Sequence, residues 1–163
     1  MLTAEQLEIT QAEYDALLKV RDTIGALKHI RDPNCTLFTG NTFNMGTVTY
    51  TSDDPSHCGT CQCIGGWLYT FMINVAPNKH GVYAVDPEES RWYVSEERSP
   101  ILYHLFYPLS KPDGRWMRDD EGKELDYDYN LITPEQAVQA INNFLTKRDA
   151  RWDIILLDNH VAA

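Results

Sequence analysis

Three of the four cysteines of this chain lie within six residues, at Cys58, Cys61 and Cys63, and His57 stands directly before them. Cys35 lies apart from this cluster. Thiols and an imidazole so close together could bind a metal, exchange disulfides or supply a nucleophile. The N-terminal sequence MLTAEQLEITQAEYD is acidic and amphipathic, which is not typical of a signal peptide. A framework of structural disulfides is therefore not the default interpretation.

Zinc is one alternative for this cluster. Cys58 and Cys61 have the two-residue spacing that lets both thiolates face one zinc ion, and Cys63 or His57 could add a ligand. A closed zinc site normally draws on two separated pairs of ligands, and the sequence shows no second pair. We therefore expect no cofactor, with zinc on Cys58, Cys61, Cys63 and His57 kept as the alternative.

A thiol enzyme is a second alternative. The segment Cys58-Gly-Thr-Cys61 before an expected helix resembles thioredoxin, in which case Cys58 would attack and Cys61 would resolve. The preceding DDPSH lacks the aromatic lead of thioredoxins, and a third cysteine would tend to scramble disulfides. CGTC is also similar to the CGSC of papain-like proteases, but Gln62 and Pro55 stand where that family has tryptophan and glutamine. No residue is assigned a catalytic role.

A structural role for the cluster is the interpretation we favour. Apolar residues recur at steps of three and four after Thr60, which predicts a helix over 61–74 with Thr60 as its N-cap. Cys63 lies one turn before Trp67 on the apolar face, where a cysteine behaves as a small hydrophobic residue. Cys58, Thr60, Cys63 and Trp67 are therefore expected to build the start of this helix or to line a small pocket.

Two segments of the chain resemble a recurring pattern in small bacterial and bacteriophage proteins. They are FNMGT at 43–47 and CGTCQCIGGW at 58–67, against F/W-D/N-M, a polar loop and C-G-T-x-x-C-I/F-A-G-W/H. The family also begins with a helix and ends with an I-T-P-E-x-A helix, matched here at 132–137. The resemblance covers about residues 14–147.

The resemblance implies roles for the cysteines and leaves the activity open. Cys58 and Cys63 match the two cysteines of the pattern, whereas Cys61 falls at a small or variable position and Gly65 replaces the usual alanine. On this basis the Cys58–Cys61 spacing is accidental, and a phage or mobile-element origin is expected.

The other elements follow from patterning and from stop signals. We expect helix from the N-terminus to residue 31 and over 134–147, with capping boxes at Thr10 and Thr133. A strand is expected over 47–51, a hairpin from 82–85 and 92–94, and a short helix over 101–107. Residues 154–157 suit a closing strand or a helical turn. The pair Gly65-Gly66 inside a helix suggests close backbone packing.

Composition bounds the class of protein. The chain has 163 residues, 43% of them hydrophobic, and a formal charge of −10. It can bury a core, and its acidity argues against binding of nucleic acid or of anionic lipid. Half of the acids, 12 of 24, fall in 86–128, so an inhibitor that mimics nucleic acid is a further alternative.

These features lead to one overall expectation. We expect a helix-rich α+β fold with a few short β segments, forming a single domain over 1–163. The function expected is that of a cytoplasmic, non-enzymatic binding or accessory protein with a protein partner, no membrane association and no nucleic-acid ligand.

Overall fold

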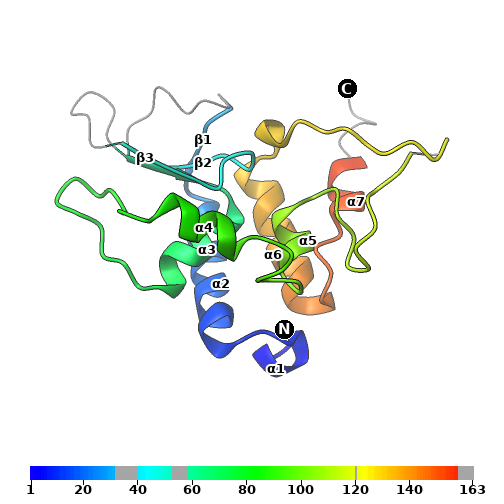
Figure 1. Cartoon of the computed structure of the whole chain (residues 1–163), viewed down its shortest axis with the longest axis horizontal. Helices are drawn as coiled ribbons and strands as arrows, with labels where there is room; N and C mark the ends of the chain where they lie inside the picture. Colours follow the sequence, from blue (N-terminus) through cyan, green and yellow to red (C-terminus); the bar gives the residue numbers. More distant parts are fainter. Residues whose placement is uncertain (32–39, 53–58, 120, 158–163) are drawn as a thin grey trace.

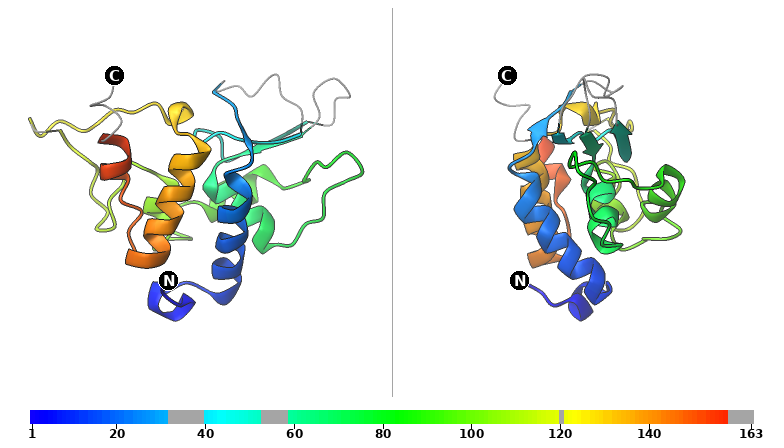
Figure 2. Two further views of the ribbon diagram at one scale, coloured as in Figure 1. Left: turned by 180° about the vertical axis from the view of Figure 1, so that it is seen from behind. Right: turned by 90° about the vertical axis from the view of Figure 1, so that its left-hand side faces the viewer.

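The computed structural model describes residues 1–31, 40–52, 59–119 and 121–157 (Figure 1). The described elements are helices and a small four-stranded sheet, which confirms the helix-rich α+β class. The sheet lies at one end of the molecule, and the longer helices α2 and α6 run away from it (Figures 1 and 2). No described helix is long and apolar enough to span a bilayer.

The N-terminal region forms two helices and a short strand. Helices α1 (Ala4–Leu7) and α2 (Gln11–Ile24) each begin at a capping box, built by Thr3 and Thr10. The expected continuous helix to residue 31 is wrong, because the chain turns after α2 and enters strand β1 (Lys28–His29). The backbone N–H of Ile30 donates to the carbonyl of Phe43 at 2.8 Å. Pairing with the sheet thus overrides the local preference for helix.

The sheet has the order β1-β2-β4-β3 and is mixed. Strand β2 (Gly40–Phe43) pairs in parallel with β1 and with β4 (Gly59–Gln62), and β3 (Thr49–Ser52) runs antiparallel to β4. The strand expected over 47–51 is thus present with slightly later bounds. The parallel β2–β4 pair places Phe43, the first residue of FNMGT, beside Gln62 of the CGTCQCIGGW segment.

Helix α3 (Ile64–Met72) begins later than expected. Its N-cap is Cys63, whereas Thr60 and Cys61 belong to strand β4. The prediction of a helix from Cys61 with Thr60 as N-cap is therefore wrong. The strand continues through Gln62 because its backbone pairs with both β2 and β3, and such pairing is invisible in a local pattern.

The segment after α3 also differs from its prediction. Residues 82–85 form no strand, and α4 (Pro87–Tyr93) takes the place of the second arm of the expected hairpin. Asp86 caps this helix, with its Oδ1 accepting from the N–H groups of Glu88 and Glu89 at 2.8 and 3.1 Å. Pro87 stands in the first turn, so the sequence D-P-E-E marks the start of a helix. The aromatic residues that follow had instead suggested a strand.

The C-terminal elements complete the core. The short helix α5 (Tyr103–Phe106) lies within the expected 101–107, and η1 (Tyr129–Leu131) precedes α6 (Pro134–Lys147), whose predicted bounds are confirmed. Residues 154–157 belong to α7 (Trp152–Leu157), so the helical alternative is confirmed and the closing strand is wrong. Helix α2 packs against both α3 and α6. The largest fully buried side chains include Trp67, Trp152, Tyr93, Phe43 and Phe144.

Candidate functional site

The described part of the cysteine motif, residues 59–67, forms the corner between strand β4 and helix α3. Thr60, Cys61, Cys63 and Trp67 are all buried there, with at most 3% of each residue exposed. Cys61 lies against Ile30, whereas Cys63 and Trp67 belong to the main core. Cys35, His57 and Cys58 lie outside the described residues.

The thiol of Cys63 serves the fold as a helix cap. Its Sγ accepts from the backbone N–H of Gly66 at 3.5 Å, and its own N–H donates to the carbonyl of Thr47 at 2.7 Å. Burial raises the pKa of this thiol, against a smaller opposing effect of the backbone N–H groups around it. A buried thiol with a raised pKa is mostly protonated at neutral pH and is a poor nucleophile.

Cys61 does not have the surroundings of a redox cysteine. It lies in strand β4, and helix α3 begins three residues later at Ile64. Cys61 therefore does not stand at the helix N-terminus, which is a position typical of reactive cysteines. Its full burial also keeps its sulfur from an external disulfide.

Thr60 and Trp67 tie the corner to neighbouring segments. The Oγ1 of Thr60 accepts from the N–H of Tyr83 at 2.9 Å, and the indole Nε1 of Trp67 donates to the carbonyl of Thr42 at 3.1 Å. Trp67 also packs edge-on against the ring of Tyr83, with 5.6 Å between ring centroids. The polar atoms of both predicted pocket residues are thus engaged within the fold.

The glycine pair allows α3 to approach two other parts of the chain. A Cβ on Gly66 would lie 1.8 Å from the carbonyl oxygen of Val48, and a Cβ on Gly65 would lie 2.5 Å from Cγ1 of Val94. Close packing is therefore the reason for both glycines, as expected from the sequence. Only a residue without a side chain fits against the Val48 backbone.

Asn44 and Gln62 hold the same corner, and sequence reasoning assigned them no role. Asn44 Nδ2 donates to the carbonyl of Ile30 at 2.7 Å, while its Oδ1 accepts from the N–H of Gly46 at 2.7 Å. Gln62 Nε2 donates to Thr49 Oγ1 at 2.7 Å, and its Oε1 accepts from Thr70 Oγ1 at 3.0 Å. Both side chains are fully buried, and their places inside the segments FNMGT and CGTCQCIGGW were the available signal.

No described group of three His, Cys, Asp or Glu side chains is arranged to hold a metal ion. The alternative of zinc on Cys58, Cys61, Cys63 and His57 includes two residues outside the described ranges, so it stays a prediction. Within those ranges, the two cysteines are engaged as described above.

The acid-rich segment 86–128 does not present a surface of one sign. Asp86 caps α4, Asp113 pairs with Arg115 at 2.7 Å between Oδ2 and Nε, and Glu124 pairs with Arg118 at 2.8 Å. Arginines of the same segment thus partly neutralise its carboxylates. This arrangement gives no support to mimicry of nucleic acid.

Four adjoining cavities run along another face of the molecule, and we call them the cavity row. The first, of about 300 Å³, lies between the α1–α2 junction and residues 98–102. It shares Pro100 and Ile101 with the second, of about 380 Å³, which reaches the end of α6.

The second cavity of the row shares His104 and Asp149 with the third, of about 140 Å³. Lys111 joins the third to the fourth, of about 350 Å³, which Arg115, Trp116 and Arg118 complete.

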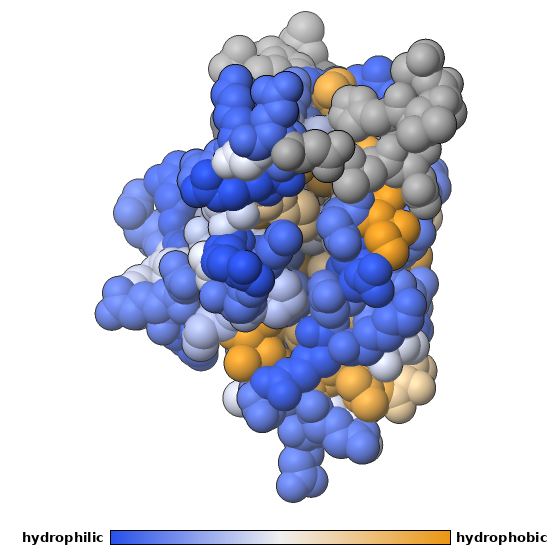
Figure 3. All heavy atoms as spheres, turned by 90° about the vertical axis from the view of Figure 1, so that its right-hand side faces the viewer, coloured by the Kyte–Doolittle hydropathy of each residue, from blue (hydrophilic) through white to orange (hydrophobic). Residues whose placement is uncertain are grey.

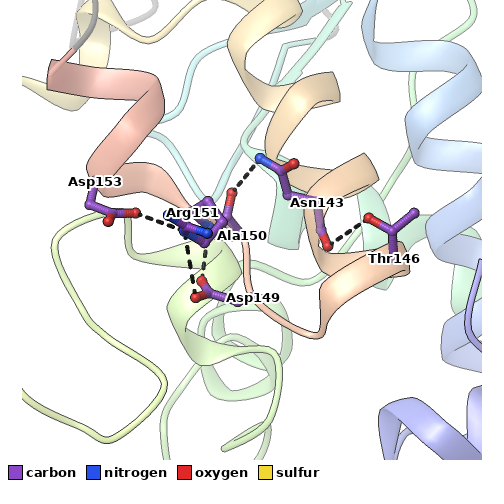
Figure 4. A network of polar contacts seen from close by, with 6 residues as sticks. All are labelled: Asn143, Thr146, Asp149, Ala150, Arg151 and Asp153. Carbon is purple, nitrogen blue, oxygen red and sulfur yellow. Dashed lines mark hydrogen bonds and ion pairs between the residues drawn. The ribbon is translucent and has the colours of Figure 1, made fainter.

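The middle of the cavity row is held by polar contacts at the α6–α7 connection (Figure 4). Asp149 Oδ1 accepts from the N–H of Arg151 at 2.9 Å, and the Arg151 guanidinium lies 3.5 Å from Asp153 Oδ1. Asn143 Nδ2 donates to the carbonyl of Ala150 at 3.2 Å. These contacts fix the position of Asp149 beside the cavities.

His104 lines the second and third cavities from helix α5. Only 5% of its surface is exposed, and its Nε2 has no hydrogen-bond partner among the described residues. Burial lowers the pKa of its imidazole, while the charge of Asp149 and a hydrogen bond to the backbone of Ile101 oppose this effect. The side chain is therefore mainly neutral at pH 7.

The cavity row was not predicted from the sequence. Its residues come from segments separated by up to 145 positions, from Glu8 to Asp153, and no local pattern links them. The only available signal was the presence of Lys111, Arg115 and Arg118 around Trp116 inside an otherwise acidic segment.

Comparison with protein-family models, with curated proteins and with solved structures finds no match to this chain. The resemblance to the bacterial and bacteriophage pattern therefore stays a prediction. The functional argument consequently depends on the geometry described above.

Proposed function

We propose that this chain is a cytoplasmic, non-enzymatic binding or accessory protein for a protein partner, of phage or mobile-element origin. In this proposal the CGTxxC motif builds the β4–α3 corner, and the partner is bound elsewhere on the surface. The resemblance of the motif to the phage pattern is the basis for the proposed origin.

The observation that carries the proposal is the internal use of the motif. Cys63 caps α3, Thr60 anchors the segment at Tyr83, and the indole of Trp67 donates to strand β2. Side chains that are buried and hydrogen-bonded within the protein are not free to perform chemistry on an external substrate. These internal hydrogen bonds support a structural role for the motif rather than a role as the active site of a thiol enzyme.

Thiol reactivity, measured residue by residue, tests this proposal. The reduced protein is treated briefly with iodoacetamide, and alkylated cysteines are identified by mass spectrometry of peptides, before and after denaturation. We expect Cys61 and Cys63 to react only after denaturation, because burial excludes the reagent and raises the pKa of Cys63. Cys58 should titrate close to the ordinary thiol pKa of about 8.5, and zinc analysis should show much less than one ion per chain.

Two results would overturn the proposal. A Cys58 pKa far below its ordinary value, together with a disulfide to Cys61 that forms and is reduced reversibly, would favour the thioredoxin-like alternative. Zinc at one ion per chain that is lost in a Cys58→Ala variant would favour the metal site. A Thr51→Ala variant, at an exposed position of strand β3 without a thiol, serves as the control for both measurements.

A further inference from the structure

The cavity row is rich in cations, although the chain as a whole is acidic. Six of its 14 Lys and Arg residues line the row, against four of its 24 Asp and Glu residues. The rest of the molecule therefore carries all of the excess negative charge. Figure 3 shows the side of the molecule that carries α7, where hydrophilic residues predominate and hydrophobic ones lie between them.

Three of these cations have no carboxylate partner among the described residues. They are Arg98 in the first cavity, Lys147 in the second, and Lys111 between the third and the fourth. All three side chains are exposed. The other three arginines of the row are paired, Arg115 with Asp113, Arg118 with Glu124 and Arg148 with Glu8.

The fourth cavity adds an aromatic contact. Trp116 is 37% exposed, whereas Trp67 and Trp152 are buried in the core. Tryptophan and arginine are enriched where protein interfaces gain most of their binding energy. An exposed tryptophan beside three cations suits a ligand segment with an apolar or aromatic residue next to acidic ones.

We propose that the cavity row binds an extended acidic segment of a partner protein. Carboxylates of that segment pair with Arg98, Lys147 and Lys111 in turn, and an apolar side chain rests on Trp116. This inference depends on the proposed function, because it specifies the chemistry of the protein partner and the surface that binds it.

An acidic peptide fits the row better than a nucleic acid does. A nucleic acid carries one negative charge on every phosphate and would approach a molecule of net charge −10. The row also contains carboxylates of its own, at Glu8, Glu13, Asp149 and Asp153. A peptide can place neutral residues beside these carboxylates and acidic residues beside the three cations that have no carboxylate partner among the described residues.

Fluorescence anisotropy with defined probes tests the proposal. The probe is a labelled peptide of alternating Glu and Ser with one terminal Tyr, measured at low salt, where exposed charges interact most strongly. The comparison ligands are the same peptide with Gln in place of Glu, and an oligothymidylate. The wild-type protein should bind the acidic peptide at least about tenfold more tightly than either comparison ligand.

Matched variants locate the binding surface. The row variant combines Arg98→Gln, Lys111→Gln and Lys147→Gln, and the control combines Arg31→Gln, Lys28→Gln and Lys79→Gln. All six side chains are exposed, and both variants lose one arginine and two lysines, so they have the same net charge. The row variant should bind the acidic peptide about tenfold more weakly than wild type, and the control should stay within about twofold.

The outcomes separate the two proposals. Equal weakening in both variants, or no binding of the acidic peptide by wild type, would overturn the assignment of the cavity row. Tighter binding of the oligothymidylate that is lost in the row variant would reassign the row to a nucleic acid. Each of these results leaves the proposed structural role of the cysteines intact, because that role fails only through the reactivity of Cys58 or through bound zinc.

Discussion

Gly66 shows how a single residue determines the β4–α3 corner. A methyl group at this position would overlap the carbonyl oxygen of Val48. This oxygen is a backbone atom directly before strand β3, so it cannot move aside as a side chain could. At Gly65 the nearest atoms are side-chain atoms of Val94 and Phe106, which can shift. Steric demand is therefore absolute at the second glycine and partial at the first.

We predict that Gly66→Ala lowers the free energy of unfolding by about 3 kcal/mol or more, because overpacking against backbone forces α3 away from the sheet. Gly65→Ala should cost less, about 1–2 kcal/mol. Gly25→Ala is the control, since its Cβ would meet only Val138 Cγ2 at 3.4 Å. Urea denaturation measures all three variants, and equal losses for Gly66→Ala and Gly25→Ala would contradict the close contact.

His104 links the buried side chains to pH. Its folded-state pKa is lowered by burial, so below about pH 6.5, the ordinary pKa of histidine, the unfolded chain binds more protons than the folded one. We therefore predict that the free energy of unfolding is fully retained at about pH 7.5 and above, and that it falls as the pH is lowered from there through about 6.5 to 5.5. His29, whose pKa is also lowered mainly by burial, acts in the same direction.

The His104→Gln variant checks this pH dependence. Urea denaturation at several pH values should give a flatter dependence for this variant than for wild type, whatever its absolute stability. The exposed His80→Gln variant should keep the wild-type slope, because that side chain is in solvent in both states. A wild-type slope in His104→Gln would show that other groups cause the loss of stability in acid.

At the scale of elements, helix α4 depends on its cap. Asp86 satisfies two backbone N–H groups at the start of a seven-residue helix that packs on α3. We predict that Asp86→Ala lowers the free energy of unfolding by about 1 kcal/mol, and that Asp86→Asn or Asp86→Ser retains most of it. Thermal unfolding of the three variants measures this, with Glu97→Ala as an exposed control. An Asp86→Asn variant as unstable as Asp86→Ala would argue against capping.

The elements differ in how far local sequence determines them. Helix α6 was predictable to its bounds. Thr133 and Gln136 form a capping box, Pro134 stands in the first turn, and a stripe of buried apolar residues follows. The α2–β1 boundary and the start of α3 were not predictable, since Lys28–His29 is extended through pairing with β2 and Gly59–Gln62 through pairing with β2 and β3. Helix α4 was predictable in principle from Asp86-Pro87, but the aromatic residues after it favoured a strand.

Of the two regions described above, the β4–α3 corner was predictable from the sequence and the cavity row was not. Sequence reasoning singled out Thr60, Cys63, Trp67 and the glycine pair, and the structure places all of them at one corner. The cavity row depends instead on how α5, α6 and the 110–118 segment come together in space. Such proximity follows from tertiary packing, which spacing along the chain does not encode.

At the scale of the whole molecule, the distribution of charge has two opposite consequences. Outside the cavity row the acids are in large excess, so their mutual repulsion opposes the compact state. Within the row, Arg98, Lys147 and Lys111 would attract an acidic ligand, and salt weakens that attraction. Screening therefore acts on stability and on binding with opposite signs.

We predict that raising NaCl from about 20 to about 500 mM increases the free energy of unfolding of the unliganded protein, because the Debye length shrinks from about 20 Å to a few ångströms and repulsion among the acids is screened. Binding of the acidic peptide should weaken over the same range. Urea denaturation and anisotropy on the same samples measure both effects, and KCl in place of NaCl should give the same results. A fall in stability with salt would mean that ion pairs such as Arg118–Glu124 outweigh the net repulsion, and that the molecule is held together by its charges despite the excess of acids.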